Sequence, residues 1–154
     1  MPRTTRRNLL IAAGCLAMPG RLLAQEAPSI HVVEGSGCDC CAEWTAYLRR
    51  EGFRVTTEKR AGADLSRHKA ELGVPEAYQS CHTGQLAGYF VEGHVPAADL
   101  RRLLRERPDA AGLAVPGMPW GSPGMGPESE REAYDVLLVG KDGRSQVFSS
   151  YPAA

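Results

Sequence analysis

The chain has 154 residues, with 18 basic and 18 acidic side chains and a formal net charge of zero. This length is enough for one domain and hardly for two. A balanced charge lacks the excess of Lys and Arg that neutralises nucleic-acid phosphates, and the apolar run near the N-terminus is too short for a permanent membrane helix. We therefore expect neither a nucleic-acid partner nor a stable membrane span.

Residues 1–24 are typical of an export signal. Arg3, Arg6 and Arg7 precede an apolar run over residues 9–18, and Leu22-Leu23-Ala24 offers a cleavage site. The adjacent arginines resemble a twin-arginine signal, which exports folded proteins, and an ordinary Sec signal is the alternative. Either route predicts a periplasmic protein.

Two consequences follow from this signal. A lipid-anchored protein cleaved at Cys15 is a weaker alternative, because only about five apolar residues precede that cysteine, fewer than an export signal normally uses. Residues 1–24 hold four of the 18 basic residues and no acid, so the mature chain carries 14 basic and 18 acidic residues, a net charge of −4. We expect residues 25–154 to form a single domain.

The apolar pattern predicts strands and helices in regular succession after residue 29. Strands are expected at 30–34 and 53–58 and as a pair within 85–91 that turns near 87–88, and helices at 41–50, 64–72 (capped by Asp64, with His68 solvated) and 96–107. The first strand, helix and strand follow so closely that they predict a right-handed unit with parallel strands.

The last third of the chain is dominated by a loop and a hairpin. Residues 114–127 hold too many prolines and glycines for regular structure, so they predict a long loop with a fairly fixed backbone. Residues 134–139 and 146–148 flank Asp142-Gly143, a strong β-hairpin signal. The resulting order, βαβαββα with a C-terminal β-hairpin, predicts an α/β protein with a mixed sheet that resembles the thioredoxin fold.

Three cysteines lie where the first strand gives way to the first helix. Cys38, Cys40 and Cys41 follow a glycine at the helix N-terminus, where free N–H groups and the helix dipole favour thiolate over thiol. A disulfide within this group closes a loop of at most four residues and constrains the unfolded chain very little. The thiols are therefore better placed for redox chemistry or metal binding than for stabilising the fold.

Cys81 and His82 are the expected partners of these thiols. In a thioredoxin-like sheet the segment before the third strand faces the first helix's N-terminus, and here Cys81-His82 takes the place of the cis-proline found in thioredoxins. Four thiolates and an imidazole suit Cu(I) or Zn(II), and adjacent cysteines favour thiolates that bridge more than one Cu(I). The alternative is that Cys81 is a buried core thiol and His82 only caps a loop.

Three further residues are candidate ligands. Met118 and Met125 in the Pro/Gly-rich loop carry thioethers that suit Cu(I), although both could equally be packing residues. His94 follows a glycine and precedes the third helix, which brings it toward the same end of the sheet.

Several short sequence motifs together resemble those of the CopG-type family, which are small exported metal-binding proteins of bacterial copper resistance. They lie at residues 38–44, 72–75, 80–83, 91–96 and 112–119, and the similarity covers nearly all of residues 30–151. Asp39 is a departure, because the family more often has glycine there. Its negative charge beside the thiolates favours a bound cation.

The resemblance implies a periplasmic copper-binding protein that holds Cu(I), as one ion or several, on Cys38, Cys40, Cys41, Cys81 and His82. Its expected partners are copper ions, with other periplasmic copper-handling proteins as further candidates, and interconversion of copper oxidation states is left open. One alternative is a thiol–disulfide oxidoreductase that uses Cys38 and Cys41, although Cys40 would invite misrouted disulfides. A structural zinc site is a third, weaker hypothesis.

Overall fold

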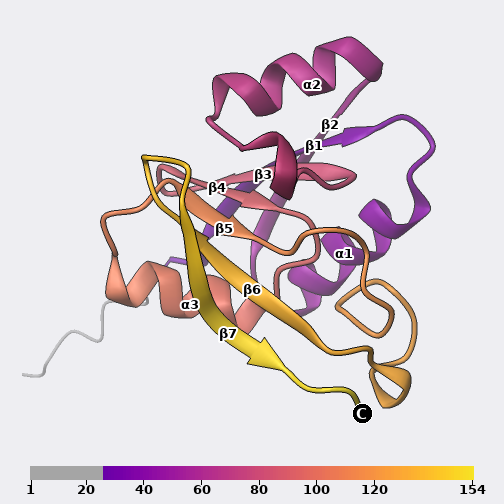
Figure 1. Cartoon of the computed structure of the whole chain (residues 1–154). Helices are drawn as coiled ribbons and strands as arrows, with labels where there is room; N and C mark the ends of the chain where they lie inside the picture. The colour runs from indigo at the N-terminus through magenta and orange to yellow at the C-terminus, as the bar shows by residue number, and fades with distance from the viewer. Residues whose placement is uncertain (1–25) are drawn as a thin grey trace, which may run out of the picture.

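A seven-stranded mixed sheet in the order β2-β1-β3-β4-β5-β6-β7 organises the molecule (Figure 1). The computed structural model describes residues 26–154, so the predicted export signal and Cys15 lie outside the described part. The strands are β1 Ser29–Gly35, β2 Arg54–Arg60, β3 His82–Leu86, β4 Tyr89–Glu92, β5 Gly112–Ala114, β6 Tyr134–Val139 and β7 Ser145–Tyr151. The helices are α1 Asp39–Arg50, α2 Gly62–Glu71 and α3 Ala97–Glu106, with short 3-10 turns at Glu76–Tyr78 and Glu128–Glu130.

The pairing of the strands confirms the predicted α/β class and the mixed sheet. β1 pairs with β2 in parallel and β4 pairs with β5 in parallel, whereas the other neighbours are antiparallel. The first strands and helices thus follow the predicted βαβαββα order. The C-terminal hairpin β6–β7 joins the same sheet through β5.

The two faces of the sheet are covered by different helices. On one face Trp44 and Leu48 of α1 and Leu100 of α3 are fully buried against strand residues that include Val32 and Val91. The alternation of side chains along a strand sends the neighbours of these residues to the other face, where α2 packs. Figure 1 shows α2 at the top of the view, away from α1 and α3.

Several element boundaries differ from the sequence prediction. α1 begins at Asp39, two residues earlier than expected, so Cys38 is its N-cap residue and Cys40 lies in its first turn. α2 begins at Gly62 after Ala61, so the prediction that Asp64 caps this helix is wrong. Neither N-cap residue, Cys38 or Ala61, makes a side-chain capping hydrogen bond, so no capping residue marks these helix starts in the sequence.

The burial of one α2 residue and the presence of the strand β5 also differ from the sequence prediction. His68, expected to be solvated, is only 8% exposed, because it lies with Lys69 on the buried side of α2. The strand β5, at Gly112–Ala114, was not predicted. Three residues carry too little pattern to identify a strand, and this one is defined by its two neighbours, β4 and β6.

The hairpin is attached to α3 by polar contacts. Asp99 of α3 accepts hydrogen bonds from the hydroxyls of Ser149, at 2.5 Å, and Tyr151, at 2.6 Å. The guanidinium of Arg102 lies 4.0 Å from the ring centre of Phe148 and donates to its carbonyl oxygen at 2.7 Å. These contacts attach β7 to α3, in addition to its pairing with β6.

The Pro/Gly-rich loop after β5 returns to the N-terminal end of α1. Gly124 lies so close to the backbone of Trp44 that a Cβ atom built there would be 2.6 Å from the Trp44 nitrogen. The hydroxyl of Ser80 donates to the carbonyl oxygen of Gly117 at 2.8 Å. The loop therefore contacts both segments that carry the predicted site.

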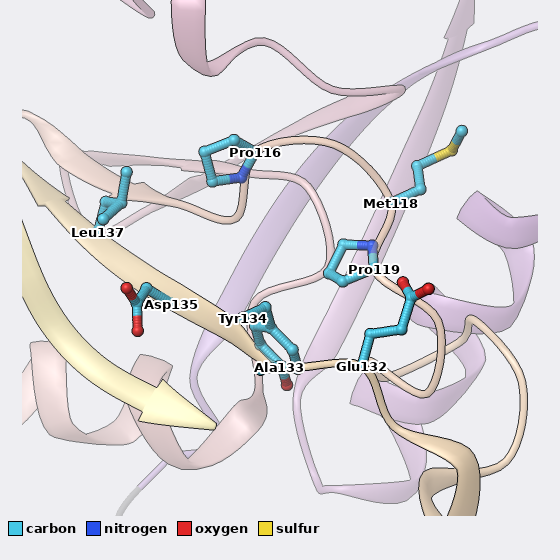
Figure 2. Close-up of a pocket in the computed structure, with 8 residues that line it drawn as sticks. All are labelled: Pro116, Met118, Pro119, Glu132, Ala133, Tyr134, Asp135 and Leu137. Atoms are coloured by element: carbon cyan, nitrogen blue, oxygen red, sulfur yellow. The ribbon is translucent and has the colours of Figure 1, made fainter. Parts of the chain in front are cut away.

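An open groove of about 520 Å³ separates this loop from β6 (Figure 2). Pro116, Met118 and Pro119 line one side, and residues 132–135 and Leu137 line the other. Its lining contains neither Cys nor His, so this groove is distinct from the thiol-bearing site. No helix within residues 26–154 combines the length and hydropathy that a membrane span requires.

Candidate metal centre

The N-terminus of α1 positions three of the four described cysteines. Cys38 and Cys41 form a disulfide, and the Cys40 sulfur lies 3.4 Å from the Cys38 sulfur. Cys41 is fully buried, whereas Cys38 and Cys40 are half-buried. Asp39 is exposed in the first turn of the helix, where its negative charge complements the helix dipole.

Cys81, the residue before β3, brings the fourth sulfur to this group. The Cys81 sulfur lies 3.7 Å from the Cys40 sulfur, and all four sulfurs lie within 4.8 Å of one another. Cys40 and Cys81 are 41 positions apart in the chain, and the β1–β3 pairing is what brings them together. The four sulfurs thus converge as the sequence predicts, and their role as metal ligands stays a prediction.

Two imidazoles face the Cys81 sulfur from the other side. His82 places Nδ1 at 3.4 Å and His94 places Nε2 at 3.6 Å from that sulfur. These three residues form a second group that could hold a metal ion, and it shares Cys81 with the four-sulfur group. His94, expected only as a possible ligand, is therefore part of the cluster, and the sequence signal was its place between Gly93 and α3.

Hydrogen bonds to backbone carbonyls fix the tautomer of each imidazole. His82 donates from Nε2 to the Gly93 carbonyl at 3.0 Å, and His94 donates from Nδ1 to the Pro123 carbonyl at 2.9 Å. A carbonyl oxygen only accepts, so the remaining ring nitrogen of each histidine keeps its lone pair toward Cys81. Metal-binding histidines are oriented by partners of this kind.

Burial keeps both imidazoles neutral. His82 and His94 are fully buried, and the Trp44 ring covers His82 with 4.3 Å between ring centres. Burial, with a contribution from nearby His94, lowers the pKa of His82 to about 3. Burial also lowers the pKa of His94. Both rings therefore offer a free nitrogen lone pair at neutral pH, which is the form that binds metals.

Burial shifts the pKa of the Cys81 thiol upward, whereas it shifts the pKa of the two imidazoles downward. Burial, and then the neighbouring Cys40, raises the pKa of Cys81 to about 11. Cys81 is not on a helix N-terminus, so it does not share the stabilisation of thiolate expected for the α1 cysteines. A metal ion that binds this sulfur must therefore displace a proton.

The two methionines are placed differently from the cysteines. Met118 is 54% exposed at the rim of the groove, and its thioether points away from Asp135 and Leu137 (Figure 2). It follows Gly117, which is bonded to Ser80 beside Cys81. Met125 is half-buried and donates its backbone N–H to the Ser122 carbonyl. The assignment of either thioether to a metal ion stays a prediction.

One polar feature beneath the site was not expected from the sequence. Glu92 is fully buried and pairs with Lys69, which is 3% exposed, at 2.5 Å between Oε1 and Nζ. Burial raises the pKa of the Glu92 carboxyl, and Lys69 opposes this shift. A charged residue within a strand suggests an exposed position, so only the structure could reveal this pair.

Comparison with known proteins places the chain among copper resistance proteins. Residues 78–125, which contain Cys81, His82, His94 and most of the Pro/Gly-rich loop, match the family described as "Protein of unknown function, DUF411". No curated protein matches the chain. Two solved structures, "Copper resistance protein copG" in Form 1 and in Form 2, are each 47% identical to it.

The likeness to these two structures extends over their whole length. They cover 83% and 82% of this chain and are themselves covered completely, with TM-scores of 0.76 and 0.75. Such identity over the whole of both relatives and most of this chain means a shared fold and common descent. The chain therefore belongs to the CopG family of copper resistance proteins.

Proposed function

We propose that this protein is a periplasmic copper-binding protein of copper resistance. It holds Cu(I) on Cys38, Cys40, Cys41, Cys81 and His82, with His94 as a sixth donor. The observation that carries this proposal is the convergence of four sulfurs and two correctly oriented imidazoles around Cys81. The names of the two solved relatives support copper as the metal.

The chemistry of the donors favours Cu(I) over harder cations. Thiolate and neutral imidazole are the ligands that soft transition metals prefer, whereas the carboxylates preferred by Mg²⁺ or Ca²⁺ are absent from the two donor groups. The groups share Cys81, so a thiolate at this position would bridge two ions. This supports the expectation of more than one copper ion.

The redox state of Cys38 and Cys41 sets the number of available ligands. While they form a disulfide, Cys40, Cys81 and the two histidines are the remaining donors. Reduction by two electrons breaks the S–S bond and yields two thiolates. Two Cu(I) ions can supply those electrons and become Cu(II), so the same site could interconvert copper oxidation states.

A thiol–disulfide oxidoreductase is the second candidate function, and the Cys38–Cys41 disulfide at a helix N-terminus is the observation in its favour. Such an enzyme needs one attacking and one resolving thiol, and neither Cys40 nor His82 is required for that chemistry. A copper site depends on every ligand. Substitutions outside the Cys38–Cys41 pair therefore separate the two functions.

The deciding experiment measures Cu(I) affinity of the fully reduced protein by competition with a chromophoric chelator. We expect Cys40→Ser, Cys81→Ser and His82→Ala each to weaken binding about tenfold or more. Met118→Ala should have a smaller effect and serves as the matched control. Wild-type affinity in Cys40→Ser and Cys81→Ser, with loss only in Cys38→Ser and Cys41→Ser, would indicate a plain dithiol and refute the multi-ligand site.

Export to the periplasm is part of the proposal and has its own test. Residues 1–24 act as the signal, and copper ions and other periplasmic copper-handling proteins are the expected partners. N-terminal sequencing of protein recovered from the periplasmic fraction should begin near residue 25. A chain that starts at lipid-modified Cys15 would instead support the lipoprotein alternative.

A further inference from the structure

A buried polar network lies on the α2 face of the sheet, behind the candidate metal centre. Glu92 accepts hydrogen bonds from Lys69 Nζ, from the Ser80 backbone N–H and from the Thr83 hydroxyl, each at 2.5 Å. Lys69 also donates to the Thr83 hydroxyl oxygen at 2.7 Å. A buried ion pair seldom stabilises a fold more than apolar residues of similar volume would, so this network needs a reason other than stability.

The position of the network along the chain supplies that reason. Ser80 immediately precedes Cys81, and Thr83 immediately follows His82, so Glu92 is bonded to the residues on both sides of two candidate ligands. Glu92 itself precedes Gly93, whose carbonyl orients His82. His94, the third donor of this group, is the next residue after Gly93.

The side chains of Glu92 and His82 act from opposite faces of the sheet. Glu92 reaches toward Lys69 of α2, whereas His82 packs against Trp44 of α1. β3 begins at His82, so Ser80 and Cys81 lie beyond the regular strand ladder. The bond from the Ser80 N–H to Glu92 therefore fixes a stretch of backbone that the sheet does not hold.

We propose that the Lys69–Glu92 pair is a positioning device for the metal centre. It fixes the backbone of residues 80–83 against that of residues 92–94, so that the Cys81 sulfur and the two imidazole nitrogens meet at one point. Lys69 and Glu92 contact no metal and are not ligands. The inference rests on the proposed copper-binding function and adds residues that none of the site's donor groups contains.

The first test replaces both charges at once. In Lys69→Met/Glu92→Leu the pair gives way to apolar side chains of similar volume, so no buried charge is left without a partner. We expect wild-type circular dichroism and a cooperative urea transition at a somewhat lower midpoint, because the Ser80 N–H and the Thr83 hydroxyl lose their acceptor. Cu(I) affinity of the reduced variant should fall about tenfold to a hundredfold, the range typical of groups that orient metal ligands. The Cu(I)–thiolate absorption in the near ultraviolet should change as well.

The second test removes the two hydrogen bonds that the Thr83 hydroxyl makes in the network, one donated to Glu92 and one accepted from Lys69. Thr83→Val removes the hydroxyl with almost no change of shape, whereas Thr83→Ser keeps it. We expect weaker Cu(I) binding in the valine variant and wild-type binding in the serine variant. Should the double variant fail to fold, the comparison of the two Thr83 variants tests the positioning role. Asp109→Asn, which removes the exposed partner of Lys141, is the control for the loss of a charge pair.

The outcomes separate this inference from the proposed function. If wild-type protein binds Cu(I) no better than a variant in which Cys38, Cys40, Cys41 and Cys81 are all serine, the proposed function fails. If wild type binds and the folded double variant keeps wild-type affinity and spectrum, the positioning role fails while the function stands. Equal binding in Thr83→Val and Thr83→Ser would also overturn the positioning role.

Discussion

Cys81 is the single residue on which both donor groups depend. Its sulfur is within 3.7 Å of Cys40 and within 3.6 Å of a nitrogen of each histidine. Every other residue of the two groups belongs to only one of them. Loss of this sulfur would therefore separate a thiol cluster from a pair of imidazoles, whereas loss of any other donor would leave the two groups joined.

The raised pKa of Cys81 predicts how copper binding depends on pH. With a pKa of about 11, this thiol is protonated at neutral pH, and the metal must displace the proton. Apparent Cu(I) affinity should therefore rise with pH between about 6 and 9, by about one decade per pH unit for this thiol. His82 adds nothing in this range, because its pKa is about 3.

Chelator competition at several pH values measures this slope. The slope for Cys81→Ser should be smaller than that of wild type by about one decade per pH unit. An unchanged slope in the serine variant would mean that Cys81 does not bind the metal as a thiolate.

The lowered pKa of His82 predicts loss of stability in acid. The unfolded imidazole titrates near 6.5 and the folded one near 3, so the unfolded state binds the proton more tightly between these values. The stabilisation is fully present above about pH 6.5 and is lost as the pH falls toward about 3. Its size is on the order of a few kcal/mol, because each tenfold difference in proton affinity between the two states corresponds to about 1.4 kcal/mol.

Urea unfolding of metal-free protein across this window provides the measurement. His82→Phe keeps an aromatic ring against Trp44 but cannot be protonated, so its free energy of unfolding should vary less with pH. His94 is present in both proteins and contributes equally. Parallel pH curves for the two proteins would contradict the prediction.

Among the elements, the turn between β4 and α3 is tightly constrained at its glycine. Gly93 has φ of 74°, and a Cβ atom there would lie 2.5 Å from the Val115 carbonyl oxygen. A left-handed backbone alone costs a non-glycine residue about 1–2 kcal/mol. The contact with Val115 adds to this cost, so Gly93→Ala should lower the free energy of unfolding by more than that amount. It should also weaken Cu(I) binding, because the carbonyl that orients His82 would move.

Gly88→Ala is the matched control for this turn. Gly88 has φ of 91°, and a Cβ atom there would meet nothing within 4 Å. We expect a loss of stability of about 1–2 kcal/mol and unchanged copper affinity. Urea unfolding and chelator competition on both variants test the comparison, which fails if the two variants lose copper affinity equally.

The contact between α3 and β7 predicts a change of stability without a change of binding. Asp99 is 3% exposed and accepts from Ser149 and Tyr151. Asp99→Ala leaves both hydroxyls without this acceptor and should lower the free energy of unfolding by about 2–4 kcal/mol. Copper affinity of the folded variant, measured by chelator competition, should equal that of wild type. A weaker site would mean that the hairpin contributes to it.

Elements with a strong local pattern could be predicted from the sequence, and those defined by neighbours could not. Trp44 and Leu48, four residues apart, identify α1 because a helix places them on one face. β5 has no such pattern and is a strand only because β4 and β6 flank it. The burial of His68 likewise depends on where α2 packs, which no local period encodes.

The same distinction applies to the candidate site. Cys38, Cys40 and Cys41 are recognisable from their spacing alone, and the expected fold brings Cys81 and His82 to them. His94 is different, because its orientation depends on Pro123, 29 residues further along the chain. Glu92 and Lys69 are 23 residues apart and belong to different elements, so their pairing could be found only in the folded structure.

For the whole molecule, the donors come from three separate segments, which has a thermodynamic consequence. Copper ions on the two donor groups, which share Cys81, would together link the start of α1, the start of β3 and the β4–α3 turn. A ligand that binds only the folded state stabilises that state by about 4 kcal/mol when its concentration is a thousand times the Kd. Reduced protein should therefore show a Tm that rises with Cu(I), and differential scanning calorimetry measures it.

The disulfide state provides the control for this prediction. Protein that retains the Cys38–Cys41 disulfide has fewer thiols to bind the ion, so its Tm should rise less. Cys81→Ser should lose most of the shift. A Tm that does not depend on Cu(I) in the reduced wild-type protein would contradict binding to the folded state.

The orientation of both imidazoles by main-chain carbonyls also bears on how this site tolerates mutation. Every amino acid has the carbonyl group that Gly93 and Pro123 present to His82 and His94. A substitution that preserves the path of the chain cannot delete either acceptor, as it could delete an Asp or Glu in the same role. Insertions and deletions between His94 and Pro123 are the dangerous changes, because they shift which carbonyl meets the ring. Apart from glycines such as Gly124, which lie against other backbone, the loop can thus vary in side chains while its length stays fixed.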